Sequence, residues 1–337
     1  MSQVVAFPTP PPGGPPALSQ GAQGQARGAE SPFVRQVRNR LGDLALAIST
    51  GSAMALVLLI LFVVIGDVII HGSARFSLRF ITSAPEQGMT AGGIFPALFG
   101  TVAMVVLMTL AVVPVGVATA IYLHEYAPAG SPVTRAVRIA VNNLAGVPSI
   151  VFGLFGLGFF IQFVGAGMDR IFMGGQKVFG QPALLWAALT MAILTMPVVI
   201  VATEEALRSV PRELREASLA LGATKFQTVF RVVVPQGLPG ILTGTILAIS
   251  RGAGEVAPIL FTGAAYFLPT LPHTLHDQFM QLGYHVYVLA TQSPDVDATR
   301  PLLYATVLVL LVLTFALNAS AIVVRSRMRR HLSRSHG

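Results

Sequence analysis

Residues 211–235 read PRELREASLALGATKFQTVFRVVVP, and their pattern is the most informative in the sequence. It begins with Pro211, which suits the first turn of a helix. Residues at helical spacing then form one face, with small side chains in its middle: Leu214, Ala217, Ser218 and Leu221. Gly222 can adopt the left-handed conformation that ends a helix, so the first half of the stretch predicts a short helix that stops there.

A second helix is expected to begin directly afterwards. Thr224 and Gln227 have the spacing of a capping box, in which each side chain satisfies an amide at the start of the helix. The apolar stripe of this helix consists of Phe226, Val229, Phe230 and Val233. Pro235 is expected to redirect the chain into the next helix. The whole stretch therefore predicts a helical hairpin with a flat, small-residue face.

Long charge-poor runs surround this hairpin. Hydrophobic residues make up 53% of the 337 residues and charged residues 11%, whereas soluble proteins have about 25% charged residues. Six runs are long enough to cross about 30 Å of hydrocarbon as helices: 44–66, 94–123, 139–168, 178–203, 232–250 (which continues apolar beyond Arg251 and Glu255) and 301–324. The alternating ten-residue strands of a membrane β-barrel are absent from the sequence. The expected fold is an all-α membrane protein with six transmembrane helices.

The basic residues indicate how these helices are oriented. With the N-terminus inside, the inner segments hold 16 of the 22 Lys and Arg residues: 1–43, 124–138, 204–231 and 325–337. The outer segments hold five, and Arg251 lies within an apolar run. Basic residues favour the cytoplasmic side, so both termini are expected in the cytoplasm. The net charge of +8 therefore reflects membrane topology and does not indicate binding to nucleic acid.

Composition divides the chain further. Residues 1–32 hold seven prolines and five glycines and are expected to form a disordered cytoplasmic tail rather than a signal peptide. Residues 33–43 form a basic segment expected at the membrane surface. Residues 44–325 form the transmembrane domain, in which 205–235 is the cytoplasmic loop with the hairpin. Residues 326–337 form a basic cytoplasmic tail.

The hairpin carries a spaced motif. It consists of Glu216-Ala217-Ser218, three residues, Gly222, nine residues, and Val232-x-Val234-Pro235. This motif resembles the ATPase-coupling loop of type I ABC import permeases, from which Ser218 and the two valines depart by small changes of size. The resemblance implies that the loop docks on a separate ATPase subunit, which binds the ATP. Without the resemblance, the same residues describe an ordinary surface hairpin.

Two more stretches narrow the resemblance. Residues 142–157 (NNLAGVPSIVFGLFGL) and 249–258 (ISRGAGEVAP) are similar to the A-type subunit of phosphate-specific import permeases. The likeness extends over about residues 40–325. It implies a multi-pass protein of the bacterial inner membrane, paired as a heterodimer with a homologous permease subunit. The further partners that it implies are two ATPase subunits and an extracytoplasmic phosphate-binding protein.

Charged residues within an apolar run are candidates for the translocation path. Arg251 and Glu255 stand four residues apart and would share one helix face. Each is costly in hydrocarbon, by about 2.5–3.5 kcal/mol, so both should face the bundle interior or a polar path. A guanidinium can donate two hydrogen bonds to phosphate, although the pair could also serve only to hold helices together. Asn142 and Asn143 could line the same path or bond between helices.

The sequence offers no sign of catalysis in this chain. Lys177 and Lys225 are not preceded by glycine, so a phosphate-binding loop of the GxxxxGK[ST] type is absent and ATP must be hydrolysed elsewhere. No cofactor is expected in the chain. His273, His276 and Asp277 are weak candidates for a metal site, and none is predicted. Gly240 and Gly244 form a GxxxG pair, which most often indicates close helix packing.

Some alternatives stay open. Leu275, Phe279, Leu282 and Val286 have helical spacing and predict a short helix that lies on the outer membrane face. A permease of the same architecture could carry another anion or solute, such as sulfate, molybdate or an amino acid. A secondary carrier driven by an ion gradient would leave the hairpin without a role. A membrane scaffold without transport activity would leave Arg251 and Glu255 without a function.

Overall fold

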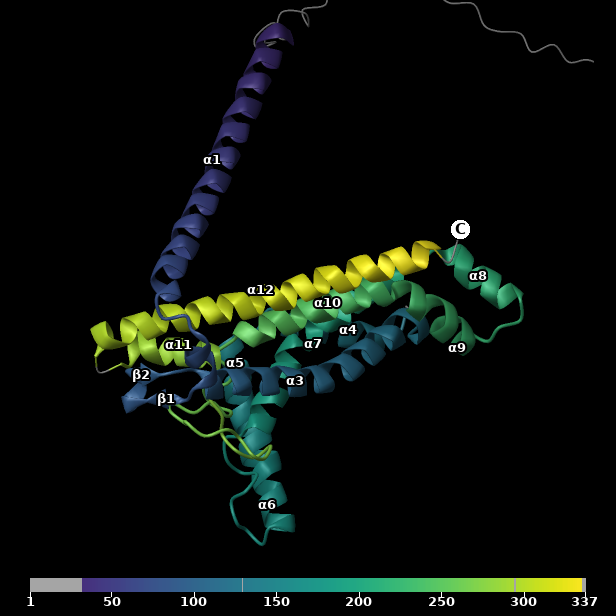
Figure 1. The fold of residues 1–337 in the computed structure, drawn as a ribbon. Helices are drawn as coiled ribbons and strands as arrows, with labels where there is room; N and C mark the ends of the chain where they lie inside the picture. Colours follow the sequence, from purple (N-terminus) through teal and green to yellow (C-terminus); the bar gives the residue numbers. More distant parts are fainter. Residues whose placement is uncertain (1–31, 129, 294, 335–337) are drawn as a thin grey trace, which may run out of the picture. The chain divides into compact units, whose positions relative to one another are not determined.

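The computed structural model describes residues 32–128, 130–293 and 295–334, and it is mainly helical (Figure 1). The chain divides into two compact units, Met1–Val64 and Ile65–Gly337. Six helices in the described part are long and apolar enough to cross a membrane: Asp43–Ser73, Phe95–Tyr126, Ser149–Phe172, Leu184–Arg208, Lys225–Gly254 and Val296–Ser320. The predicted number of membrane-spanning helices is thereby confirmed.

The longest connection between helices in the described part is 255–281, which joins the helix that ends at Gly254 to the helix that begins at Leu282. The α-helices are α1 (Pro32–Ser73), α2 (Leu78–Thr82), α3 (Phe95–Ile121), α4 (Pro132–Leu144), α5 (Ser149–Phe155), α6 (Ala166–Phe172), α7 (Leu184–Arg208), α8 (Arg212–Ala220), α9 (Lys225–Thr228), α10 (Val234–Gly254), α11 (Leu282–Thr291) and α12 (Val296–Arg334). Three π-helical segments continue or join them: η2 (Tyr122–Tyr126), η3 (Gly156–Gly165) and η4 (Val229–Val233). A 3-10 turn, η1 (Gln87–Met89), connects β1 (Pro85–Glu86) to β2 (Ala91–Gly92) in a small antiparallel sheet that the sequence did not predict.

The core of the second unit lies where α3, α7 and α10 meet. Large apolar side chains fill it, among them Met104 and Met108 of α3 and Met191 of α7, all without exposed surface. Close backbone approach brings α10 against α7. A Cβ added to Gly244 would overlap Ala202, and one added to Gly240 would lie 2.7 Å from the Cβ of Ala206. The GxxxG pair therefore serves helix packing, as its pattern indicates.

The two ends of this unit differ. At one end, shown on the left of Figure 1, β1, β2 and α11 lie close to the beginnings of α3 and α12. At the other end, α8 and α9 lie beyond the last turn of α7 and the start of α10. We call these the α11 end and the α8 end. The helical hairpin and the longest predicted outer loop thus lie at opposite ends of the bundle.

The apolar run 139–168 is not one helix, and here the predicted boundaries were wrong. The chain forms α4, breaks after Leu144, and resumes as a span at Ser149. Pro148 cannot donate a backbone hydrogen bond and disfavours a helical conformation in the residue before it, so α4 cannot continue through this point. The third span therefore begins ten residues later than its hydropathy suggests.

The second helix of the hairpin is not separated from the span that follows. Helices α9, η4 and α10 form one helix of 30 residues, Lys225–Gly254. Pro235 lies in the first turn of α10, directly after the π-helical turn of η4. A π turn accommodates a local change in the hydrogen-bond pattern without ending the helix. The expected redirection of the chain at Pro235 was therefore wrong.

The predicted tails are described in part. Except for Pro32, the predicted N-terminal tail of residues 1–32 lies outside the described residues. Residues 33–43 belong to α1, which continues into the first span, and their position at the membrane surface stays a prediction. In the predicted C-terminal tail of 326–337, α12 extends to Arg334, and the last three residues are outside the described part.

Candidate functional site: the helical hairpin and the far end of its helix

The hairpin of residues 212–228 is fixed at its turn by backbone hydrogen bonds. Gly222 has φ +86°, and its amide donates to the carbonyl of Leu219 at 3.0 Å. The amide of Ala223 donates to the carbonyl of Ser218 at 3.2 Å, which completes a Schellman ending of α8. Thr224 and Gln227 then form both bonds of a capping box at the start of α9. The predicted helix end and capping box are confirmed.

Arg215 anchors the hairpin to the rest of the protein. Its guanidinium donates to the carbonyls of Val210 at 2.7 Å and Leu207 at 2.8 Å. These carbonyls belong to the last turn of α7 and the residues after it, where helices leave acceptors without partners. The same guanidinium contacts the carboxylate of Glu125 at 3.0 Å, and the two side chains are only 18% and 10% exposed. The sequence did not single out Arg215, because its carboxylate partner Glu125 is 90 positions away in the chain.

Ser218 has a partner across the hairpin. Its hydroxyl lies 2.9 Å from the hydroxyl of Thr228, which is buried at the end of α9. An alanine at this position, as in the resembled motif, could not make this hydrogen bond. The departure from the motif therefore adds a direct link between the two arms of the hairpin.

The opposite surface of the hairpin is exposed. Glu216 and Ala217 are exposed on α8, and Leu221 at the turn keeps 90% of its surface. Leu219 is 48% exposed beside it. Larger exposed apolar patches mark contacts with other proteins or with a membrane, whereas single apolar side chains are common on protein surfaces. The hairpin thus presents small and apolar side chains outward while Arg215 and Ser218 hold its inner side.

A second arginine anchors α4 at the same end of the bundle. Arg138 contacts the carboxylate of Glu204 on α7 at 3.1 Å and donates to the carbonyl of Leu123 at 2.9 Å. Asn142 and Asn143 follow on the same helix, and both are exposed. They lie on α4, outside the third span, and not within a membrane-crossing helix as the run 139–168 suggested.

Arg251 and Glu255 lie at the far end of the long helix. Arg251 is in the last turn of α10, and Glu255 follows that helix in an extended conformation. The Nε atom of Arg251 is 3.6 Å from Oε1 of Glu255, with 67% of the arginine side chain and 21% of the glutamate side chain exposed. Arg251 therefore does not point into the interior of this chain's bundle. An exposed pair contributes little to stability, which leaves its guanidinium available to an anion.

Gln281 binds the backbone between Arg251 and Glu255. Its fully buried side chain donates to the carbonyl of Ala253 at 3.1 Å and accepts a hydrogen bond from the amide of Tyr284 at 2.6 Å. The amide of Leu282, the residue after Gln281, donates to the hydroxyl of Thr101 on α3 at 2.9 Å. The start of α11 is thereby bound to both α10 and α3. Sequence patterns did not indicate Gln281 either.

The residues considered for a metal serve the loop itself. The carboxylate of Asp277 accepts hydrogen bonds from the amides of His273 and Thr274, both at 2.8 Å. The hydroxyl and amide of Thr274, together with the amide of His273, lower the pKa of Asp277. Within the described ranges, no three His, Asp or Glu side chains come together in a way that could hold a metal ion.

Comparisons with known proteins agree on one family. Residues 113–330 match the family described as binding-protein-dependent transport system inner membrane component. The probable ABC transporter permease protein YqgI of Bacillus subtilis is 35% identical over 262 residues, which cover 74% of this chain and 84% of that protein. The phosphate transport system permease protein PstA 1 of Mycobacterium tuberculosis is 37% identical over 248 residues, 74% of each chain.

Solved structures share the fold at low sequence identity. A chain of a bacterial ABC transporter for import of the acidic polysaccharide alginate is 17% identical, with a TM-score of 0.57 over 86% of this chain and 99% of that one. A chain of the MetNI methionine ABC transporter is 18% identical, with a TM-score of 0.51 over 69% and 94%. The six spans, the hairpin and the family match lead to one conclusion: the chain belongs to the family of inner membrane components of binding-protein-dependent transport systems, the multi-pass permease subunits of ABC importers.

Proposed function

We propose that this chain is one membrane-spanning half of an ATP-driven importer of inorganic phosphate in the bacterial inner membrane. The observation that carries the proposal is the continuous helix Lys225–Gly254, which begins in the hairpin and ends with Arg251 in its last turn. Movement of the hairpin would reach the anion-binding end of this helix without an intervening loop. The likeness to phosphate permeases over about three quarters of the chain supports phosphate as the substrate.

The energy source lies in another subunit. The chain has no phosphate-binding loop in its sequence, so we infer that it hydrolyses no ATP and needs no cofactor of its own. Glu216, Ala217, Ser218, Gly222 and Pro235 carry the coupling motif. Exposed Ala217 and Leu221 would enter a groove on an ATPase subunit, two of which close around ATP. The hairpin would transmit that closure through Arg215 and the long helix.

Further partners complete the transporter. A homologous permease subunit would form a heterodimer with this chain, and the substrate would pass between the two halves by alternating access. The α8 end would face the cytoplasm, in agreement with the distribution of Lys and Arg. The α11 end would then face outward, where a phosphate-binding protein delivers its ligand. Asn142 and Asn143, exposed on α4, would face the partner subunit or the path near the cytoplasm.

Arg251 and Glu255 would act together on the anion. The guanidinium would donate paired hydrogen bonds to phosphate oxygens, and the carboxylate would hold the arginine while the site is empty. Their weak contact of 3.6 Å allows this exchange of partners. An importer for sulfate or another anion would use the same chemistry, so the substrate requires a direct measurement.

Two measurements test the proposal. The natural chain contains no cysteine, so a single cysteine at Ala217 is the only thiol of this chain that can be crosslinked in the assembled transporter. We expect crosslinks from Ala217→Cys to the ATPase subunit and none from Phe172→Cys, which is exposed at the end of α6. Absence of crosslinks would refute the coupling role. Uptake of labelled phosphate, compared with labelled sulfate and molybdate, decides the substrate, and faster uptake of another anion would refute phosphate.

A further inference from the structure

Helix α10 has two faces of opposite character. At 3.6 residues per turn, Gln236, Gly240, Thr243, Leu247 and Arg251 lie on one face. Leu238, Ile241, Leu242 and Thr245 lie about half a turn away on the other. Each face borders a groove, and the two grooves differ in their lining. Arg251 thus lies on the first face and not on the second.

The first groove contains polar groups. It has a volume of about 550 Å³ and lies between α7 and α10. Its polar lining consists of Glu205 from α7, Ser209 directly after α7, and Gln236 and Thr243 from α10. Leu247 ends the lining toward the α11 end, and Arg251 follows one turn later on the same face of the helix. The groove therefore points along α10 from the hairpin end toward the proposed anion site.

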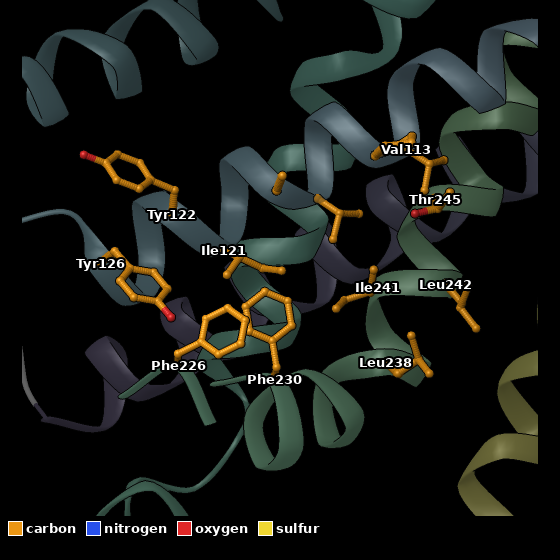
Figure 2. A pocket seen from close by; sticks show the side chains of 13 residues that line it. Val113, Ile121, Tyr122, Tyr126, Phe226, Phe230, Leu238, Ile241, Leu242 and Thr245 are labelled. Carbon is orange, nitrogen blue, oxygen red and sulfur yellow. The ribbon is translucent and has the colours of Figure 1, made fainter. Parts of the chain in front are cut away.

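The second groove is almost wholly apolar. It has a volume of about 690 Å³ and is lined mainly by aliphatic and aromatic side chains of α3, α9, η4 and α10. Figure 2 shows Leu238, Ile241 and Leu242 on this side of α10, with Phe226 and Phe230 near them. Such a lining suits contact with lipid or with apolar side chains, because it offers almost no hydrogen bonds to a hydrated ion.

We infer that the groove between α7 and α10 forms the inner part of the anion's path, with Glu205 at its cytoplasmic mouth. The inference rests on the proposed function and adds the route by which the substrate leaves Arg251. The polar lining of this groove accommodates a hydrated anion, whereas the apolar lining of the second groove does not. Gly240 and Gly244 bring α10 close to α7, and the groove follows the line of this contact.

Glu205 places a negative charge at the cytoplasmic mouth of the path. An anion at Arg251 is held by positive charge, whereas an anion near Glu205 meets a negative charge. Phosphate would therefore spend little time at the cytoplasmic mouth and would re-enter it slowly. Arg208, three residues further on α7, lines a neighbouring hollow together with Glu205 and does not line this groove. The carboxylate is thus the charged group that the groove itself contains.

Adjacent residues offer a matched test. Thr243 and Leu242 are both half-buried but line opposite grooves. In the assembled, nucleotide-free transporter in inverted membrane vesicles, we expect an anionic methanethiosulfonate to label Thr243→Cys at least about tenfold faster than Leu242→Cys. Equal rates, faster labelling of Leu242→Cys, or no labelling of either would overturn the path.

Two further labelling experiments test the role of Glu205 and the identity of the anion separately. One unit charge at roughly 8 Å in water changes the local concentration of a monovalent anion about two- to threefold. Glu205→Gln should therefore speed anionic labelling of Thr243→Cys about two- to threefold without changing the rate of neutral methyl methanethiosulfonate, and an unchanged anionic rate would refute the role of Glu205. Added phosphate should slow the labelling. If sulfate slows the labelling of Thr243→Cys and phosphate does not, the groove is still the path of an anion but phosphate is not the substrate.

Discussion

The guanidinium of Arg215 contacts the carboxylate of Glu125 at 3.0 Å, although the two residues are 90 positions apart in the chain. Glu125 lies in η2, which continues α3, and Arg215 also binds two carbonyls at the end of α7. One side chain therefore joins the hairpin to the ends of two spans. A force on α8 would reach both spans directly and not only through the connecting loops.

Replacing Arg215 should uncouple the hairpin. Arg215→Met would leave Glu125 half-paired in a mostly buried place and free two carbonyls, at a cost of about 2–3 kcal/mol. We expect phosphate uptake to fall at least tenfold and the thermal midpoint of the purified complex to decrease. Adding Glu125→Gln should restore part of the stability. Arg212→Met, on the exposed side of α8, is the control, and an equal loss of uptake in both variants would argue against the anchor.

The turn of the hairpin depends on a left-handed residue. Gly222 has φ +86°, and an added Cβ would meet nothing within 4 Å, so Gly222→Ala carries only the backbone strain of about 1–2 kcal/mol. Gly222→Pro cannot adopt this φ and should abolish uptake while membrane insertion persists. Gly167→Ala, at a helical glycine that is equally open, should be neutral. Normal uptake by Gly222→Pro would contradict a role for the hairpin geometry.

Gln281 should position the end of α10. Gln281→Leu removes both the donor to Ala253 and the acceptor for Tyr284, which we expect to cost about 1–3 kcal/mol. Gln281→Glu keeps the acceptor for Tyr284 but places a carboxylate against the carbonyl of Ala253 at a fully buried position, so it breaks the bond to α10 and adds a desolvation cost. If that bond places Arg251, Gln281→Glu should raise the half-saturating phosphate concentration for uptake, whereas exposed Gln278→Glu should not. A lower maximal rate with unchanged half-saturation would favour a purely structural role.

A buried histidine should make stability depend on pH. His285 of α11 is 2% exposed, and burial lowers its pKa to about 4 from 6.5. The folded-state pKa is below the unfolded-state value, so the unfolded chain takes up the proton first. Stability is therefore fully present above pH 6.5 and decreases by up to about 3 kcal/mol as the pH falls to 4.

The histidine can be removed to test this. Nδ1 of His285 is buried without a hydrogen-bond partner among the described residues, so His285→Leu should be close to neutral at pH 7.5. Thermal unfolding of the purified complex between pH 7.5 and 4.5 measures the effect. The decrease should be smaller in His285→Leu than in the natural protein. Parallel curves for the two proteins would show that other groups cause the pH dependence.

The sequence predicted best what depends on local pattern. The six spans follow from long apolar runs, and the ending at Gly222 and the capping box at Thr224 follow from residue types at fixed spacing. Arg251 and Glu255 were visible because charge is rare in an apolar run. The break before Ser149 was missed because hydropathy averages over Pro148 and treats an interrupted run as one.

The contacts between distant segments could not be predicted. Arg215 and Gln281 have unremarkable neighbours in the sequence, and their roles appear only when α7 and α10 are placed beside them. The predicted outer helix also failed in its position: α11 begins at Leu282, and Phe279 and Leu282 are fully buried instead of lying on a membrane surface. Helical spacing alone does not reveal that Gln281 caps the helix and fixes where it starts.

The unbroken helix Lys225–Gly254 has a mechanical consequence. Its 30 residues span about 45 Å, so a rocking of roughly 5° about one end displaces the other by about 4 Å. That distance is comparable to the diameter of a phosphate ion. A small tilt of this helix at its hairpin end would therefore be enough to open or close a passage of the width of the ion. No helix would need to unfold or change its register.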